Sequence, residues 1–301
     1  MQSGLLLVDK PEGMTSHDVV AKVRRLVGTR KVGHAGTLDP MATGLLVLGI
    51  ESATRLLTFI VGADKTYEAT IRLGASTVTD DRESDFLAIA PKETLDSLSE
   101  SQILLEVAKL TGEIMQIPSS VSAIKIDGQR AYAKVRGGEA VELASRPITV
   151  ERFELLAQPR CVEVAGNSFL EIDVVVDCSS GTYIRALARD LGAALGVGGH
   201  LSALRRTRVG GYRVSDAYRF DQDFSATAIM PNAQAAREIF PEIQLSAVEK
   251  QDLVHGKRIA NRISSTESIA AFDSNDRLVA ILEPVGANLK SVVVFAEAIN
   301  D

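Results

Sequence analysis

Asp39 is the titratable residue whose surroundings in the sequence are most unusual. It lies in a stretch of small residues, Gly33–Gly44, directly before Pro40. Proline restricts the preceding residue to extended backbone and so stiffens the loop, while the glycines let a bulky substrate approach closely. A titratable side chain held in this way is a candidate functional residue. Asp-Pro is also a common turn pair, and taken alone the dipeptide favours a turn.

The sequence contains none of the common motifs that bind nucleotide cofactors or metals. It has no GxxxxGK[ST], GxGxxG or GxSxG segment, and it has no HxxxH or CxxC pair. The four histidines are scattered along the chain, at His17, His34, His200 and His255. The sequence therefore gives no sign of a nucleotide cofactor and argues against a zinc site.

Charge is unevenly distributed along the 301 residues. The net charge of −6 by itself argues against a nucleic-acid partner, because phosphate binding depends on Lys and Arg. Residues 182–213, however, carry six arginines and one acidic residue, and residues 10–39 carry six basic and three acidic residues. Residues 80–106 carry two basic and eight acidic residues. The basic segments fit solvated helix faces and a phosphate-contact surface equally well.

Apolar patterning predicts an α+β fold, because strands and helices are interspersed without regular βαβ spacing. We expect a mixed, largely antiparallel sheet flanked by helices. The predicted strands are Leu5–Val8, Leu45–Ile50, Lys65–Leu73, Pro147–Leu156 and Phe169–Cys178, the last two as neighbours. Strict alternation in the third of these strands places Tyr67 on the packed face.

Four helices are predicted between these strands. One is capped by Ser16 and ends at Gly28, and a short one is capped by Ser52. The third runs from about Leu95 to Leu110, and the fourth opens at Ser180 and ends at Gly196. Residues 33–44 and 80–93 are expected to be irregular loops, the second on the surface.

The composition shifts after about residue 220. This predicts a first domain over residues 1–225, a linker at about 226–239 and a small β-rich domain over 240–301. The expected strands of the small domain are Ile269–Phe272, Leu278–Leu282 and Ser291–Phe295.

Apolar runs and cysteines indicate the compartment. No apolar run approaches the roughly 18–20 residues of a membrane span, and two cysteines cannot form a disulfide framework. The sequence therefore predicts a cytoplasmic protein with no membrane contact, and Cys178 is expected to be an inert buried thiol.

Six ordered blocks between residue 5 and about residue 210 resemble those of the TruB-type tRNA pseudouridine synthases. The Gly33–Gly44 segment closely resembles the catalytic signature of that family. The other blocks are Leu7–Ser16, Lys65–Tyr67 with Arg72–Gly74, Gln116–Pro118 with Ser122–Lys125, Gly181–Arg185, and Gly199–Leu201 with Leu204–Arg206. The sequence departs from some relatives at Val121, where they carry an aromatic residue.

The resemblance implies an enzyme that isomerises uridine 55, in the T-arm loop of tRNA, to pseudouridine. In this reaction the glycosidic bond breaks, the uracil turns, and C5 is joined to C1′. The target base must be flipped out of its stack, which costs a few kcal/mol. The family uses no cofactor or metal, and its members often end in a small PUA-like RNA-binding domain, with which the β-rich tail is compatible. We expect the protein to be a monomer.

The resemblance also implies roles for single residues. Asp39 matches the nucleophilic aspartate, and both C6 of the base and C1′ of the ribose are open as the atom that it attacks. Arg185 matches the arginine that pairs with this carboxylate and keeps it ionised. Tyr67 matches the tyrosine that stacks on the base, and its hydroxyl is a candidate for removing the C5 proton. The expected substrate-binding residues are Lys10, His34, Tyr183, Leu204, Arg205, Arg206 and Arg208.

Two other classes of protein fit parts of this pattern. A non-catalytic tRNA-binding or tRNA-folding protein could use the same surface, but the intact set of Asp39, Tyr67 and Arg185 argues against it. A guide-RNA-dependent synthase of the related archaeal and eukaryotic branch is the second alternative. The absence of basic extensions and the small tail favour a stand-alone enzyme.

Overall fold

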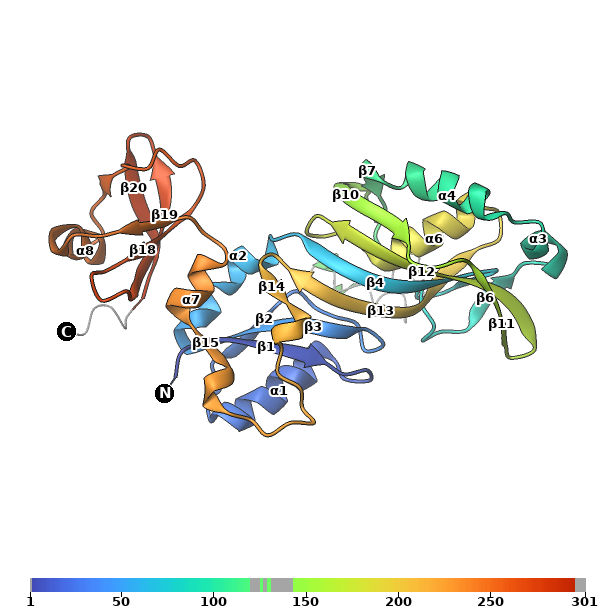
Figure 1. The fold of residues 1–301 in the computed structure, drawn as a ribbon, viewed down its shortest axis with the longest axis horizontal. Coiled ribbons are helices and arrows are strands. Elements are labelled where there is room, and N and C mark those ends of the chain that lie inside the picture. Colours follow the sequence, from blue (N-terminus) through green and yellow to red (C-terminus); the bar gives the residue numbers. More distant parts are fainter. Residues whose placement is uncertain (1, 120–124, 127–128, 131–142, 296–301) are drawn as a thin grey trace. The chain divides into compact units, whose positions relative to one another are not determined.

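The computed structural model of the chain describes residues 2–119, 125–126, 129–130 and 143–295 (Figure 1). The chain forms two compact units. Unit 1 comprises residues 1–39, 44–62 and 209–301, and unit 2 comprises residues 40–43 and 63–208. Each unit thus combines segments that are far apart in the sequence. The domain boundaries at residues 225 and 240 stay a prediction.

Strand β1 (Gly4–Lys10) lies at the centre of the N-terminal part of unit 1. It pairs in antiparallel orientation with β15 (Ile229–Pro231) and with β3 (Thr43–Ile50). Strand β2 (Val32–Ala35) also pairs with β3 in antiparallel orientation. The irregular loop predicted over residues 33–44 is therefore wrong at both ends, because β2 includes its first three residues and β3 its last two.

Helix α1 (Ser16–Val27) connects β1 to β2. Its N-cap is Thr15 and not Ser16, because the Thr15 side chain accepts a hydrogen bond from the Asp18 backbone N while the Asp18 carboxylate accepts one from Thr15 N. The Ser16 hydroxyl is bonded elsewhere. Gly28 ends the helix in the left-handed conformation, with φ 69°, as predicted.

Two short helices follow β3, namely η1 (Glu51–Arg55) and α2 (Leu57–Val61). The prediction that Ser52 caps a helix is wrong, because Ser52 lies inside η1 and the N-cap position is Ile50. The Ser52 hydroxyl instead bonds the side chains of Ser3 and Asn232. The other short elements of this part of unit 1 are β14 (Tyr212–Arg213), η2 (Val214–Asp216), η3 (Ala226–Ala228) and α7 (Asn232–Arg237).

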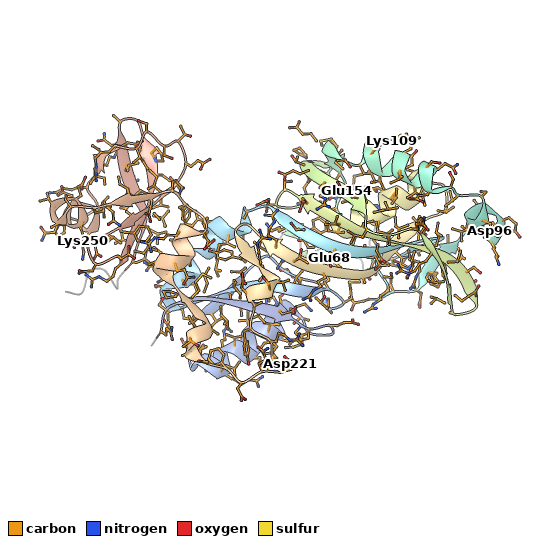
Figure 2. The ribbon with its side chains drawn as sticks, in the orientation of Figure 1. Glu68, Asp96, Lys109, Glu154, Asp221 and Lys250 are labelled. Carbon is orange, nitrogen blue, oxygen red and sulfur yellow. The ribbon has the colours of Figure 1, made fainter. Side chains whose placement is uncertain are left out.

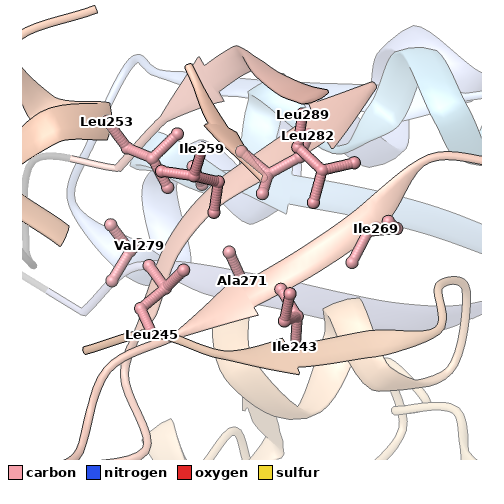
Figure 3. Close-up of a cluster of buried hydrophobic side chains, with 10 residues drawn as sticks. Ile243, Leu245, Leu253, Ile259, Ile269, Ala271, Val279, Leu282 and Leu289 are labelled. Carbon is pink, nitrogen blue, oxygen red and sulfur yellow. The ribbon is translucent and has the colours of Figure 1, made fainter. Parts of the chain in front are cut away.

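The C-terminal part of unit 1 is a sheet of five strands among the described residues, accompanied by helix α8 (Ala247–Val254). In spatial order the strands are β16 (Glu242–Gln244), β18 (Ile269–Phe272), β19 (Leu278–Val285), β20 (Asn288–Val294) and β17 (Ile259–Ala260). Apolar side chains of the strands and of α8, including Leu253, Val279 and Leu289, form a buried cluster (Figure 3). The β-rich tail is thereby confirmed.

Unit 2 is built on an antiparallel sheet in which β4 (Lys65–Leu73) is a central strand. Its neighbours are β13 (Gly199–Val209) and β12 (Asn167–Cys178). Beyond β12 the sheet continues with β10 (Arg146–Leu155) and β7 (Gly112–Gln116), and β11 (Arg160–Val164) pairs with β12. Helix α4 (Glu100–Lys109) packs against β10, and α6 (Ile184–Ala194) packs against β4 (Figure 1). The predicted strands of this region, and the α+β class, are confirmed.

Most of residues 80–93 are exposed, as predicted, but the segment is not an irregular loop throughout. Strands β5 (Ala75–Thr77) and β6 (Phe86–Ile89) form a hairpin, and Asp80 and Asp81 in its connection are buried. Polar composition was misleading here because both carboxylates have cationic partners in distant segments.

Two predicted helices also have different bounds. The helix expected over residues 95–110 is divided into α3 (Lys92–Asp96) and α4, because Ser99 and Gln102 form a capping box that starts a new helix. Helix α6 begins at Ile184, with Tyr183 rather than Ser180 at its N-cap. A small pair, β8 (Lys125–Ile126) and β9 (Gln129–Arg130), completes the described elements.

The backbone of helix α6 approaches the backbone at the start of β13 closely at Gly192. The Gly192 carbonyl accepts hydrogen bonds from the backbone N of Val197 and of Gly198. A Cβ atom on Gly192 would lie 2.1 Å from the backbone N of Gly199 and 2.2 Å from the carbonyl C of Gly198. This contact therefore has no room for a side chain.

We expect Gly192→Ala to lower the free energy of unfolding by about 1–3 kcal/mol through overpacking, although alanine is the better helix former. Urea unfolding measures the effect. The matched control is Ala193→Ser at the next, exposed position of α6, which should change the stability by no more than about 0.5 kcal/mol. A Gly192→Ala protein as stable as the control would contradict the close approach.

Candidate active site

The loop that carries Asp39 runs from β2 to β3. His34 is on β2, opposite Leu48 in the register with β3, and Gly36 has φ 84°, which glycine adopts without strain. Asp39 is half-buried. It is the last residue of the first segment of unit 1, and Pro40 begins unit 2, so the chain passes from one unit to the other at the Asp39–Pro40 peptide bond.

Lys10 ends β1 opposite Gly44, the last residue of the signature segment. Its side chain is fully buried, and Nζ donates to the carbonyl oxygens of Pro11 at 3.0 Å and Met14 at 2.5 Å. The ammonium therefore closes the turn that leads into α1. The predicted contact of Lys10 with substrate stays a prediction.

Tyr67 lies on β4 in unit 2. Its side chain is buried, as are those of Lys65 and Ala69 two residues to either side, whereas Glu68 is exposed on the other face (Figure 2). In the register with β12, Tyr67 is opposite Val176. The predicted inward position of Tyr67 is thus confirmed, and its stacking on a uracil stays a prediction.

Arg185 is held in the first turn of α6 by a buried ion pair. Only 5% of its surface is exposed, and Nη1 donates to the Thr79 carbonyl at 2.9 Å and to Asp81 Oδ2 at 3.1 Å. Asp81 Oδ1 in turn accepts hydrogen bonds from Thr79 Oγ1 at 2.5 Å and from the Glu83 backbone N at 2.9 Å. Arg185 is therefore no surface charge. Its predicted ion pair with Asp39 stays a prediction.

Strand β13 carries three of the predicted arginines. Arg205 is half-buried, and its Nη1 lies 3.4 Å from Oγ1 of Thr43 in the signature segment. Arg206 is 1% exposed. Arg208 is paired with Asp64 at 2.6 Å and, more loosely, with Asp177 at 3.7 Å. Apart from Asp190, which pairs with the neighbouring Arg189, the carboxylates that pair with this basic segment come from distant parts of the chain. The segment is therefore less strongly positive than its own composition indicates.

Tyr183 and Leu204 lie beside these groups in unit 2. The Tyr183 backbone N donates to Gln116 Oε1 at 2.9 Å, and Gln116 Nε2 donates to the Tyr183 carbonyl at 3.1 Å. The Arg146 guanidinium lies 4.8 Å from the centre of the Tyr183 ring. Leu204 is buried on β13, the neighbour of β4. Their predicted contacts with substrate stay predictions.

Burial changes the pKa values of several groups in unit 2. Desolvation, together with the charge of Arg206, lowers the pKa of Lys65 to about 8. Desolvation raises the pKa of Cys178, opposite Lys65 on β12, to about 11, so this cysteine is a thiol at neutral pH, as predicted. Burial also raises the pKa of Asp80, against the opposing effects of Ser119 and Arg189.

No three His, Cys, Asp or Glu side chains of the described residues are grouped as ligands of a metal ion would be. Within the same ranges, no helix is both long enough and apolar enough to span a membrane. Residues 120–124, including Val121 and part of one family block, lie outside the described ranges.

Sequence reasoning missed the roles of three buried polar residues. Asp81 lies in the predicted surface loop, Ser16 is the predicted helix cap, and the sequence predicts no separate role for Lys65. Lys65 could have been found, because a lysine in phase with the apolar residues of an alternating strand indicates a buried charge. Nothing local distinguishes Asp81 or Ser16 from ordinary polar residues.

Family descriptions match most of the chain. "TruB family pseudouridylate synthase (N terminal domain)" matches residues 24–184. "tRNA pseudouridylate synthase B C-terminal domain" matches residues 185–241, and "tRNA Pseudouridine synthase II, C terminal" matches residues 240–296.

Proteins of known name and structure are similar over nearly the whole chain. The protein named tRNA pseudouridine synthase B from Arthrobacter sp. (strain FB24) is 54% identical over 98% of this chain and 97% of its own length. The protein of the same name from Leifsonia xyli subsp. xyli (strain CTCB07) is also 54% identical, over 97% of this chain and 96% of its own length. The solved "Crystal Structure of a Cbf5-Nop10-Gar1 Complex" contains a chain that matches with TM-score 0.70 and 25% identity, over 97% of this chain and 85% of that one.

Matches of this extent define the class, which is that of the pseudouridylate synthases. The chain belongs to the TruB family, and the resemblance seen in its six blocks is confirmed.

The lowered pKa of Lys65 predicts how stability depends on pH. Between pH 8 and the ordinary lysine pKa of 10.5, the unfolded chain binds more protons at this residue than the folded chain. The contribution of Lys65 to the free energy of unfolding therefore rises with pH through this window and is lost as pH falls. Lys65→Met removes it. We expect the stability of the wild type relative to Lys65→Met, from urea unfolding, to rise by a few kcal/mol across the window. An unchanged difference would contradict the buried lysine.

Proposed function

We propose that this protein isomerises uridine 55, in the T-arm loop of tRNA, to pseudouridine. The N1–C1′ bond of the nucleoside breaks and a C5–C1′ bond forms, while C5 gives up its proton and N1 gains one. Membership of the TruB family and relatives named tRNA pseudouridine synthase B over nearly the full length support the reaction and the tRNA substrate. Position 55, the monomeric state and the cytoplasmic location stay predictions.

The observation that carries the proposal is Asp39 in its signature loop. The loop is bounded by two paired strands, β2 and β3, and contains a glycine with positive φ, which is typical of a backbone that holds one side chain in a fixed place. A carboxylate is a competent nucleophile for a covalent intermediate that divides one difficult step into two easier ones. We propose Asp39 for this role.

The surroundings of Arg185 and Tyr67 support the rest of the mechanism. Arg185 is fixed by Thr79 and Asp81, so its guanidinium is oriented without reorganisation when substrate binds, as electrostatic stabilisation requires. A guanidinium near the nucleophile would keep the carboxylate ionised at neutral pH. Tyr67, buried on β4, would stack on a base flipped out of the tRNA, as in other enzymes that act on a single base.

A stand-alone enzyme fits the comparisons better than a guide-RNA-dependent one. The similarity to the Cbf5 chain of a Cbf5-Nop10-Gar1 complex is 25% identity, whereas the similarity to two proteins named tRNA pseudouridine synthase B is 54% identity. We therefore propose that the chain acts on tRNA without a guide RNA.

Asp39→Asn should abolish pseudouridine formation and leave tRNA binding within about threefold of the wild type, because the amide keeps the size of the side chain but is not a nucleophile. Tritium release from 5-tritiated uridine in a T-arm stem-loop measures the reaction, and mapping of pseudouridine in full tRNA checks position 55. Asp96→Asn, on the exposed surface at the end of α3 (Figure 2), is the control and should release tritium at the wild-type rate. Substantial release by Asp39→Asn would refute the nucleophile.

Arg205 and Arg208 should differ in their effect on the salt dependence of binding. The charge of Arg208 is already opposed by the carboxylates of Asp64 and Asp177, and Arg205 contacts the neutral hydroxyl of Thr43. Arg205→Ala should therefore reduce the slope of log K against log salt by about 1, and Arg208→Ala should reduce it by less. Filter binding of the stem-loop between roughly 50 and 200 mM salt measures both slopes. Equal slopes for Arg205→Ala and wild type would assign Arg205 to structure alone.

A further inference from the structure

Ser16 joins the start of α1 to the residue directly before Asp39. It is 1% exposed, and its hydroxyl makes two hydrogen bonds to a single residue of the loop. Oγ donates to the carbonyl oxygen of Leu38 at 3.1 Å and accepts from the backbone N of Leu38 at 2.9 Å. Both backbone polar groups of a buried loop residue are thus satisfied by one side chain, in place of the sheet or helix bonds that a loop lacks.

The next residue of the same helix contacts the other end of the loop segment. The rings of His17 and His34 meet edge to face, with centroids 5.7 Å apart and planes at 79°, which is a favourable arrangement for aromatic rings. The segment from His34 to Leu38 therefore contacts two consecutive residues of α1, one at each end. Gly36, with φ 84°, lies between these two contacts.

The first turn of α1 is itself well anchored. The capping box of Thr15 and Asp18 fixes the start of the helix, and Val19 and Val23 on its inner face are fully buried. A helix that is fixed at its N-terminus and packed along one face is as rigid as the core. Its contacts therefore restrict the motion of the loop segment from His34 to Leu38.

We propose that Ser16 is a positioning residue for the reaction, which holds the backbone at Leu38 and through it the carboxylate of Asp39. The contact of His17 with His34 supports the same loop from its other end. This inference rests on the proposed function, because it needs Asp39 as the nucleophile. Misplacing a reacting group by about 1 Å can cost a factor of 100 in rate. An enzyme whose loop gains freedom at Leu38 should therefore have a lower kcat, while its affinity for the substrate stays the same.

Steady-state kinetics of Ser16→Ala on the T-arm stem-loop test the proposal. We expect kcat to fall at least tenfold, with KM and the Kd of the stem-loop within twofold of the wild type. Val23→Ala is the matched control, because it removes buried atoms from the same helix and leaves the Ser16 hydroxyl in place. At a temperature at which thermal unfolding shows all proteins to be folded, Val23→Ala should keep kcat within twofold.

His17 offers a second variant that should fold normally, because its side chain is exposed. We expect His17→Ala to lower kcat about threefold and His17→Phe, which keeps an aromatic ring against His34, to restore it. A kcat for Ser16→Ala within twofold of the wild type overturns the proposal, as does a loss no greater than that of a Val23→Ala protein with the same Tm.

The Asp39→Asn enzyme separates this proposal from the proposed function. If Asp39→Asn is inactive and Ser16→Ala is fully active, the positioning role alone is overturned. If Asp39→Asn retains turnover, the nucleophile itself is refuted.

Discussion

The buried ion pair of Arg185 and Asp81 is the interaction on which the centre of unit 2 depends. A guanidinium and a carboxylate withdrawn from water cost several kcal/mol each unless oriented partners replace the lost hydration. Here the Thr79 carbonyl and hydroxyl and the Glu83 backbone N complete the shell around the pair. The first turn of α6 and the hairpin of β5 and β6 must therefore come together before either charge is buried at acceptable cost. A cation fixed in this way is oriented before any substrate arrives, which is what electrostatic catalysis requires.

Other charged side chains are buried in each of the two units. Lys10 donates to two carbonyl oxygens of the turn before α1, and Lys65 donates to the Ala63 carbonyl and has a pKa lowered to about 8. Arg206 is nearly as buried as Lys10. Buried charges reduce stability unless they are satisfied, and perturbed titratable groups are concentrated at functional sites. These charged residues also explain why the burial patterns of β1, β4 and β13 are not purely apolar.

Local pattern predicted the elements in which one physical signal dominates. The alternation in β4 gave both its bounds and the inward face of Tyr67, and the end of α1 at Gly28 follows from the left-handed conformation that glycine adopts freely. Prediction failed where several polar residues near each other could each take the same structural role. Thr15, Ser16 and Asp18 are all good cap residues, and Thr15 is the cap because the Ser16 hydroxyl is taken by Leu38, 22 positions later. In the same way, Asp80 and Asp81 belong to an acidic, polar stretch, yet both are buried because Arg189 and Arg185 reach them from α6.

The sequence by itself determined the class of fold and the family, because strand alternation and the six ordered blocks are local features of the chain. The residues of the candidate site follow from the same blocks and stay predictions. Only the tertiary structure decided which of those side chains are fixed, and which hydrogen-bond or ion-pair partners fix them. The partners of Arg185, Arg208 and Ser16 are 104, 144 and 22 positions away in the sequence. Pairing over such separations depends on how strands and helices pack and on the free-energy cost of burying an unsatisfied polar group. A local pattern of residue types contains no information about either.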